Sequence, residues 1–430
     1  IKVPGTPGYE NAPTVVLQGH MDMVCEKTPD SDHDFSKDPI RLVYDGEWLT
    51  ADRTTLGADN GIALAMAMVA ALDKESPHPP LELLFTVDEE TGLTGACALQ
   101  PGFLSGKILI NIDSEDEGVF TVGCAGGTDS LLSVPVQGEA PPQGWELCKL
   151  SAGGMKGGHS GIDIALNRAN AIRILGRTLF GLRREGVDLR IVALEGGSAH
   201  NAIPRDGHAV LLLPGAERQR AAEIVGQCEG TVQLEFKHTD PELFLSLESA
   251  QGAAPESVLT ASASDRAIDF MLAVPHGVEA MCADIDGLVQ TSNNFARIER
   301  VQDSVQVLTS QRSSVVSEID ALSTRIEGVA RLAGGEAHRG EGYPPWPPNM
   351  DSPLLARSRE LYRRLFDKEP VVEIIHAGLE CGLIADRNPG MDMISIGPTI
   401  KDPHCPDERV HVGTIGKVWD FLAALLAELK

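Results

Sequence analysis

The chain has 430 residues, of which 42% are hydrophobic, and its 62 acidic against 36 basic residues give a formal net charge of −26. This length is typical of more than one domain, and so negative a surface repels phosphate backbones and anionic lipids, which argues against nucleic-acid and membrane partners. The longest uncharged apolar stretches run to about a dozen residues, well short of the roughly 20 that a membrane-spanning helix needs.

The first part of the chain has the pattern of alternating strands and helices. Apolar runs at 14–18, 81–87 and 107–112 predict buried strands, and the segment 62–72, rich in Ala and Met, predicts a helix between them. This order is typical of a doubly wound sheet, so we expect a fold of the α/β class.

The pattern changes after the Gly-rich turn at 123–127. Alternating strands and long amphipathic helices follow, with helices expected at 164–184 and 314–332. The segment 340–348 is a connector, because clustered Pro and Gly continue neither a helix nor a sheet.

Beyond the connector the α/β pattern returns, and its elements are a helix at 353–366, strands at 371–375 and 393–396, and a terminal helix at 413–429. Insertions enter domains at exposed loops, so the simplest organisation is one domain interrupted by another. We therefore expect an α/β domain made of 1–127 and 343–430, with an inserted α+β domain at 128–342.

Cysteine usage indicates a reducing compartment. The eight cysteines are scattered, with no C-x-x-C pair and no framework spacing. No charged and then apolar leader precedes the first predicted strand, so we expect no secretory signal. The expected location is the cytoplasm.

Polar residues follow the first predicted strand as Gly-His-Met-Asp. Residues two apart on an extended chain project to the same side, so His20 and Asp22 can serve one site. In that case His20 is a metal ligand, and Asp22 is the carboxylate that orients the imidazole or its neighbour. Alone, this pattern is more typical of an ordinary surface turn.

Asp59 lies just before the predicted helix, between Gly57 and Gly61. Its carboxylate could simply cap that helix by accepting the first free amide hydrogens. The flanking glycines favour instead a tight backbone conformation that aims the carboxylate inward, as a bridge between two cations requires.

Acidic residues also follow the other two predicted strands, where an α/β sheet opens its ligand crevice. Glu89 and Glu90 follow the second strand and Asp113 ends the third. Adjacent acids are as often a solvated loop; beside metals, one Glu is a ligand and the other a general base.

Mixed imidazole and carboxylate ligands favour zinc, manganese or cobalt, whereas calcium prefers all-oxygen shells, so His20 indicates a transition metal. The last candidate ligand, His404, lies in a loop that prolines stiffen on both sides. Cys405 is a rival soft ligand, but on an extended loop it points away, and His404 is preferred.

Taken together, these motifs resemble the co-catalytic zinc peptidases, a family that includes dipeptidases, tripeptidases and deacetylases. The resemblance covers essentially the whole chain, and His-Ala-Gly-Leu-Glu-Cys-Gly at 376–382 is most similar to the aminoacyl-histidine dipeptidase branch. The motifs that carry it are Gly-His-Met-Asp at 19–22, Gly-Ala-Asp-Asn-Gly at 57–61, Asp-Glu-Glu-Thr-Gly at 88–92, Gly-Gly-His-Ser-Gly at 157–161 and Pro-His-Cys-Pro-Asp-Glu-Arg at 403–409.

The resemblance implies two divalent ions per chain, expected to be Zn²⁺, with Co²⁺ and Mn²⁺ as alternatives. One ion takes His20 and Asp113 and the other takes Glu90 and His404, while Asp59 and a water lie between them. Asp22 stands behind His20, and Glu89 is the general base. The resemblance also implies that about sixty residues of the family's start are missing. Arg53 stands where relatives tend to carry Gly.

The resemblance further implies a homodimer formed through the inserted domain, which acts as a lid, with His159 serving the partner's site as an oxyanion donor. A polar residue in a Gly-rich turn is the alternative role for His159. For the substrate carboxylate the candidates are Arg312, Asn201 and the backbone of Gly378, with Arg205 and Arg168 as alternatives to Arg312.

The expected function is metal-dependent hydrolysis of dipeptides, of Xaa-His types such as β-alanyl-histidine. One alternative is a related amidohydrolase, either a deacylase of N-acyl amino acids or a tripeptidase. The other is a catalytically silent protein that binds metal or peptide. Retention of Glu89 argues against the silent protein, because a pure binder needs no unliganded carboxylate beside its metals.

Overall fold

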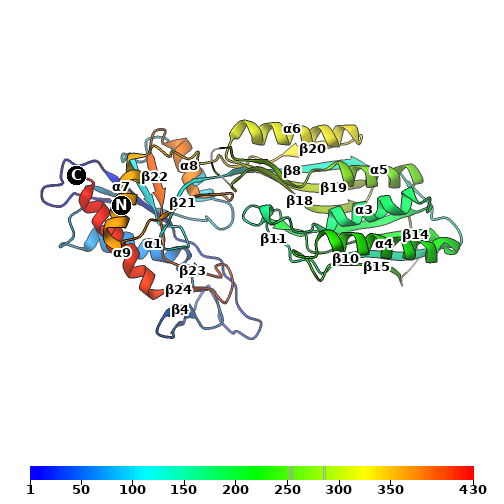
Figure 1. Ribbon diagram of the computed structural model, residues 1–430, viewed down its shortest axis with the longest axis horizontal. Helices are drawn as coiled ribbons and strands as arrows, with labels where there is room; N and C mark the ends of the chain where they lie inside the picture. Colours follow the sequence, from blue (N-terminus) through cyan, green and yellow to red (C-terminus); the bar gives the residue numbers. More distant parts are fainter. Residues whose placement is uncertain (251, 253–254, 284, 286) are drawn as a thin grey trace. The chain divides into compact units, whose positions relative to one another are not determined.

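The computed structural model describes residues 1–250, 252, 255–283, 285 and 287–430. Its contacts divide the chain into two compact units, one made of Ile1–Cys124 with Pro344–Lys430 and the other of Ala125–Tyr343 (Figure 1). The second unit contains the predicted inserted domain, whose lid and dimerisation roles stay a prediction.

The first unit is built on a seven-stranded mixed sheet with the strand order β1-β5-β2-β6-β22-β7-β21. The strand β2 pairs in parallel with β5 and β6, so these three strands end at the same edge of the sheet. The strands are Lys2–Val3 (β1), Val15–His20 (β2), Leu81–Thr86 (β5), Ile108–Asn111 (β6), Val119–Cys124 (β7), Val371–Ile375 (β21) and Asp392–Ser395 (β22).

Helices lie between these strands along the chain and at its end, as the α/β pattern predicts. They are Ala58–Leu72 (α1), Thr94–Cys97 (α2), Pro353–Phe366 (α7), Glu380–Arg387 (α8) and Val412–Glu428 (α9). The predicted bounds of α7 are confirmed, because Ser352 caps the helix by accepting from the amide of Leu355 at 2.9 Å and Pro353 occupies its first turn.

A small sheet that the sequence did not indicate lies beside this core in the first unit. Its order is β23-β24-β4-β3, with the strands Ile400–Lys401 (β23), Arg409–His411 (β24), Trp48–Ala51 (β4) and Leu42–Tyr44 (β3). The pairing of β24 with β4 brings the loop that carries His404 next to the N-terminal part of the chain.

The second unit is a nine-stranded sheet whose pairings are all antiparallel. Eight strands follow the order β15-β10-β14-β12-β18-β19-β8-β20, and β17 pairs with β18. The strands are Gly126–Pro135 (β8), Trp145–Gly153 (β10), Arg190–Gly196 (β12), Gly207–Pro214 (β14), Phe244–Ser249 (β15), Gly277–Met281 (β17), Val289–Val301 (β18), Ser304–Ser313 (β19) and Glu336–Arg339 (β20).

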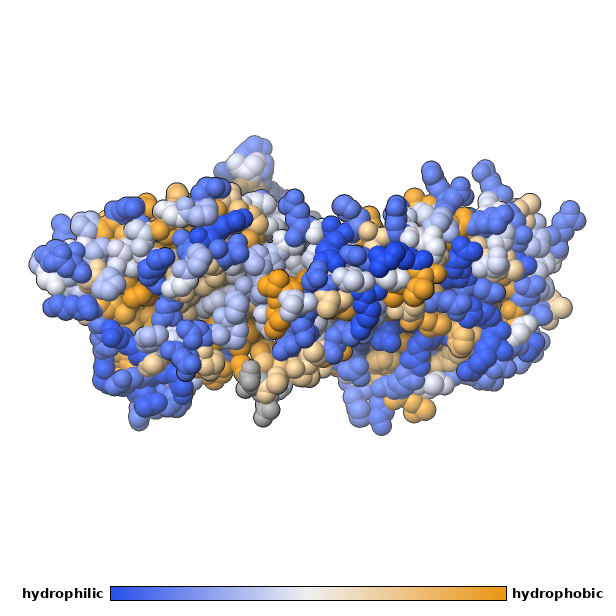
Figure 2. Space-filling model, turned by 90° about the horizontal axis from the view of Figure 1, so that it is seen from above, coloured by the Kyte–Doolittle hydropathy of each residue, from blue (hydrophilic) through white to orange (hydrophobic). Residues whose placement is uncertain are grey.

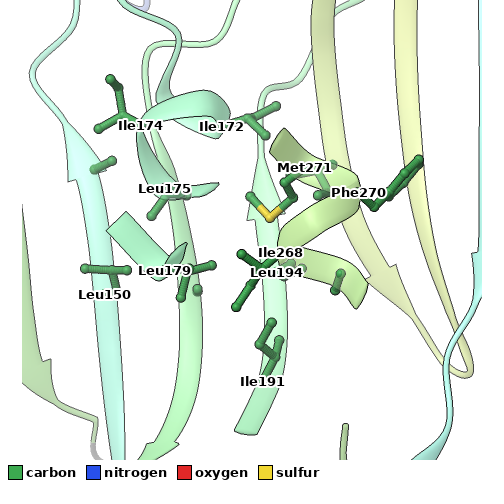
Figure 3. Close-up of a cluster of buried hydrophobic side chains, with 14 of the residues drawn as sticks. Leu150, Ile172, Ile174, Leu175, Leu179, Ile191, Leu194, Ile268, Phe270 and Met271 are labelled. Carbon is green, nitrogen blue, oxygen red and sulfur yellow. The ribbon is translucent and has the colours of Figure 1, made fainter. Parts of the chain in front are cut away.

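Helices of the second unit cover this sheet and complete its core. They are Ala171–Arg184 (α3), Arg218–Glu235 (α4), Ala261–Ala273 (α5) and Val316–Leu332 (α6). Figure 3 shows Leu175 and Leu179 of α3 near Leu150 of β10, and Ile268 of α5 near Leu194 of β12, all of them buried. Burial of each such side chain contributes about 1.5–3 kcal/mol.

The helix predicted at 164–184 begins later than expected. The start of the predicted range forms a short 3-10 helix, Ile164–Leu166. Asn167 then takes a left-handed conformation with φ 51°, and α3 starts at Ala171. The side chain of Asn170 accepts from the amides of Ile172 and Arg173 and so caps the new start. The apolar periodicity continues across this break, so the sequence pattern did not predict it.

The face shown in Figure 2 is mostly hydrophilic, with apolar residues scattered over it, as the charge of the sequence leads one to expect. Among the described residues, no helix has the length and apolar character that crossing a membrane requires. The eight cysteines all lie among the described residues, and none of them forms a disulfide.

Candidate metal centre

Three parallel strands carry their polar residues to one edge of the first unit's sheet. His20 is the last residue of β2, Glu89 and Glu90 follow β5, and Asp113 follows β6. His20 is only 1% exposed, which places its imidazole at the bottom of the cluster. The strand-end argument from the sequence therefore brings these residues together.

Asp59 lies between the two candidate histidines. Its Oδ1 is 3.0 Å from Nε2 of His20, and its Oδ2 is 3.0 Å from Nε2 of His404. The same nitrogen of His20 is 3.4 Å from Asp113, and that of His404 is 3.2 Å from Glu90. Each carboxylate oxygen of Asp59 thus faces a different imidazole.

Three overlapping groups could hold metal ions among the described residues, and they contain all the predicted ligands. Within each group the ligand atoms lie within 4.8 Å of one another. The groups are His20 with Asp59 and Asp113, His20 with Glu89 and Glu90, and Asp59 with Glu90 and His404.

The cluster fits divalent cations. Oε1 of Glu90 is buried without a hydrogen-bond partner, as expected of an oxygen kept for a metal. Burial, and then the charge of Asp113, raise the pKa of Glu89 to about 9, and burial raises the pKa of Asp113 to about 6. The acids therefore lack the positive charge that would keep them all ionised, and bound cations would supply it.

The backbone around Asp59 adopts the tight conformation that the sequence indicates. Gly57 lies in the left-handed region at φ 72°, whereas Gly61 does not, so only the first of the two glycines is required. Asp59 itself has non-helical dihedral angles, and its carboxylate does not cap α1. The capping interpretation of Asp59 is therefore wrong.

Asn60 ties two of the strand ends together. Its Oδ1 accepts from the amide of His20 at 3.3 Å, and its Nδ2 donates to the carbonyl of Ile112 at 2.7 Å. A Cβ on Gly19 would lie 2.3 Å from this Oδ1, so the residue before His20 must be glycine. These contacts fix the position of the backbone at His20.

Asp22 contacts both the imidazole and the turn that carries the two glutamates. Its carbonyl oxygen is 3.0 Å and its Oδ1 is 3.6 Å from Nδ1 of His20. Its two carboxylate oxygens also accept from the amides of Glu89 and Glu90, each at 3.1 Å. Asp22 therefore orients the neighbours of His20 as well as the ring.

The loop with His404 is more strongly bent than the sequence indicates. Asp402 and His404 both have left-handed backbones, at φ 55° and 64°. The thiol of Cys405, the rival ligand, donates to the carbonyl of Asp402 and belongs to none of the candidate metal groups. Arg53 is also left-handed, at φ 60°, which gives a physical reason for Gly at that position.

Two buried acids near the cluster were missed in the sequence. Glu380, fully buried at the start of α8, accepts from Nε2 of Gln18 and from the hydroxyl of Thr86, both at 2.6 Å, and burial raises its pKa to about 7. The other is Glu408, whose motif was recognised only for His404. Neither acid follows a predicted strand, so the pattern gave no signal.

The candidate substrate-binding residues divide between the units. Gly378 lies in the first unit, between β21 and α8, whereas His159, Asn201 and Arg312 lie in the second. Arg312 lies within β19 and not after it, and is 6% exposed. It donates to the hydroxyl of Tyr343 at 2.8 Å, and its Nε is buried without a partner.

His159 belongs to a short strand pair, β11 (Gly158–His159) with β13 (Ala202–Ile203). Its Nδ1 accepts from the amides of Gly161 and Ile162 at 3.2 and 3.1 Å, so the ring proton of the neutral form is on Nε2. Asn201 lies next to β13, and its carbonyl accepts from the amide of Ser160.

The alternatives to Arg312 are engaged elsewhere in the second unit. Arg205 donates to the carbonyl of Met155, and Arg168 donates to the carbonyl of Gly157 and pairs with Asp163 at 3.3 Å. Among these three, Arg312 is the one whose guanidinium has a buried nitrogen without a hydrogen-bond partner.

The chain is similar to known dipeptidases over its whole length. It is 41% identical to the cytosol non-specific dipeptidase of Escherichia coli over 429 residues, which cover 100% of this chain and 88% of that protein. The crystal structure of aminoacylhistidine dipeptidase from Vibrio alginolyticus matches with a TM-score of 0.87 and 42% identity, over 99% of this chain and 86% of that one.

A more distant match shares the fold alone. The structure of aminopeptidase PepT from Bacillus cereus matches with a TM-score of 0.52 at 16% identity, over 100% of this chain and 83% of that one. Residues 16–428 match the family described as peptidase family M20/M25/M40. The chain therefore belongs to peptidase family M20/M25/M40 and is a metal-dependent peptidase.

Proposed function

We propose that the chain hydrolyses dipeptides, Xaa-His types such as β-alanyl-histidine among them, at a centre of two divalent ions, with zinc as the resident metal. The names of the two similar dipeptidases support the substrate class, and the name of the first supports a cytoplasmic location. The observation that carries the proposal is Asp59, whose two oxygens each face a different histidine.

In this proposal His20 and Asp113 hold one ion, Glu90 and His404 hold the other, and Asp59 lies between them. A pair of ions bound there would lower the pKa of a water between them toward neutrality and would stabilise a developing oxyanion. The mixed imidazole and carboxylate donors support a transition metal over calcium.

Glu89 takes the proton of the attacking water and passes it to the leaving amine. Its carboxylate lies within 4.8 Å of a ring nitrogen of His20 and an oxygen of Glu90, close enough to reach a water at the centre. Asp22 keeps the base in place by accepting from its backbone amide.

The second unit supplies groups for the rest of the substrate. His159 presents Nε2–H as a neutral donor for the oxyanion, because its Nδ1 is already occupied. Arg312, with a buried Nε that lacks a partner, binds the free carboxylate, and Asn201 and the backbone of Gly378 assist.

A substrate panel tests this function. The zinc-loaded protein is offered β-alanyl-histidine, an ordinary dipeptide, a tripeptide and an acetylated amino acid, and we expect hydrolysis of the two dipeptides only. Faster hydrolysis of the tripeptide or the acetylated amino acid would identify a related amidohydrolase. Metal binding without turnover of any of the four would identify a silent binding protein.

We also propose that the chain forms a homodimer through residues 128–342, with His159 serving the partner's site. Coexpression of the Glu89→Gln and His159→Ala chains then restores activity, since mixed dimers keep one complete site. We expect about a quarter of wild-type activity, because half the dimers are mixed and each has one working site of two.

The matched control is coexpression of Glu89→Gln with Asp59→Asn. Both changes lie in the first unit, so no mixed dimer has a complete site, and activity stays at the level of the single variants. If the Glu89→Gln and His159→Ala pair also stays at that level, each His159 serves its own chain.

A further inference from the structure

Glu408 holds the backbone of the loop that carries Asp59. Its Oε2 accepts from the amides of Leu56 and Gly57 at 2.8 and 3.0 Å. Its Oε1 accepts from the amides of Ala58 and Asp59 at 2.8 and 3.3 Å. One carboxylate thus takes up four successive amide hydrogens at the start of α1, from a residue 349 positions away from Asp59.

The environment of Glu408 makes this arrangement rigid. The residue is 2% exposed, so its hydrogen bonds are not exchanged with bulk water. Its own amide donates to the carbonyl of Cys405 at 3.0 Å, and its carbonyl accepts from the hydroxyl of Thr50 at 2.8 Å. The two oxygens of one carboxylate thus serve four amide donors at a helix N-terminus, which have no partner within the helix.

The segment 404–408 contacts both the side chain and the backbone of Asp59. Nε2 of His404 contacts Oδ2 of the Asp59 side chain, while Glu408 accepts from the Asp59 amide. With this backbone fixed, the carboxylate keeps one oxygen toward His20 and the other toward His404. A small displacement of residues 56–59 would move the Asp59 carboxylate, and its two oxygens would no longer lie equally close to the two histidines.

We propose that Glu408 is a positioning residue that sets the Asp59 carboxylate between the two metal positions. The inference rests on the proposed function, in which Asp59 lies between two ions. Glu408 touches neither the ligand atoms of the imidazoles nor a reacting atom, so it acts only through the backbone of residues 56–59.

The test is Glu408→Gln, which keeps one acceptor oxygen and turns an amide group toward two of the four backbone donors. Dissociation constants for Zn²⁺ are measured by chelator competition on the metal-free protein. We expect at least one of the two constants to rise about 10- to 100-fold, the cost typical of losing a group that orients metal ligands. The control Asp407→Asn removes an exposed neighbouring carboxylate and leaves both constants unchanged.

This readout separates positioning from general stability. A merely structural Glu408 would lower resistance to urea in the metal-free protein but leave both Zn²⁺ constants of the folded variant at wild-type values, and that result overturns the proposal. Failure of the wild type to bind two ions would overturn the proposed function instead.

A second measurement needs no variant. Hydrogen exchange of the metal-free wild type is followed in a peptide that contains residues 56–59. We expect slow exchange at these amides before any metal is added, because Glu408 already binds them. Exchange as fast as that of an unstructured chain would overturn the proposal, even if the Glu408→Gln protein fails to fold.

Discussion

Replacement of Glu89 by Gln lowers kcat about 10²- to 10⁴-fold while both metal ions stay bound, because the variant loses only the group that accepts the proton. The side chain of Glu89 keeps its size and its place beside His20 and Glu90. The measurement combines steady-state hydrolysis of β-alanyl-histidine with metal analysis of the same preparation.

Glu75→Gln is the matched control, because it removes the same charge as Glu89→Gln. Glu75 is exposed and follows the C-terminal end of α1, whereas the cluster lies at the start of that helix. It keeps wild-type turnover. A Glu89→Gln protein that hydrolyses the dipeptide at the wild-type rate would show that another group is the base.

Replacement of Asp59 by Asn removes metal and activity together. An amide has a single good acceptor oxygen and no charge, so it cannot face His20 and His404 with two equivalent oxygens. We expect fewer than two ions per chain after dialysis and the loss of the zinc-dependent stabilisation of the fold, since binding to the folded state alone raises its stability.

Metal analysis and thermal unfolding with and without Zn²⁺ check this result. The control Asp420→Asn changes an exposed residue on α9 and keeps both ions. Retention of two ions with wild-type affinity in Asp59→Asn would refute the bridging role.

The main strands and long helices of the first unit were predictable because local signals define them. The run 14–18 became β2, whose residues are all buried, and Ser352 with Pro353 marks the start of α7. The small sheet was not predictable, since β3 is exposed at every residue and carries no alternation. The order of strands in the second unit depends on pairings far apart in sequence, which no local pattern encodes.

Much of the site followed from one physical rule, that the carboxyl ends of parallel strands share an edge. That rule brought His20, Glu90 and Asp113 together before any fold was known. His404 lies 345 residues from Asp59, and only the prolines that stiffen its loop marked it as a candidate ligand. The role of Glu408 could not be predicted, because nothing in the sequence distinguishes this buried acid from its exposed neighbour Asp407.

Anomalous diffraction at the zinc edge, from crystals of the zinc-loaded protein, tests the metal centre most directly. The account predicts two zinc positions per chain, about 3.5–4 Å apart, on either side of the Asp59 carboxylate. One would contact His20 and Asp113 and the other Glu90 and His404. A single zinc, or two zincs that do not share Asp59, would contradict it.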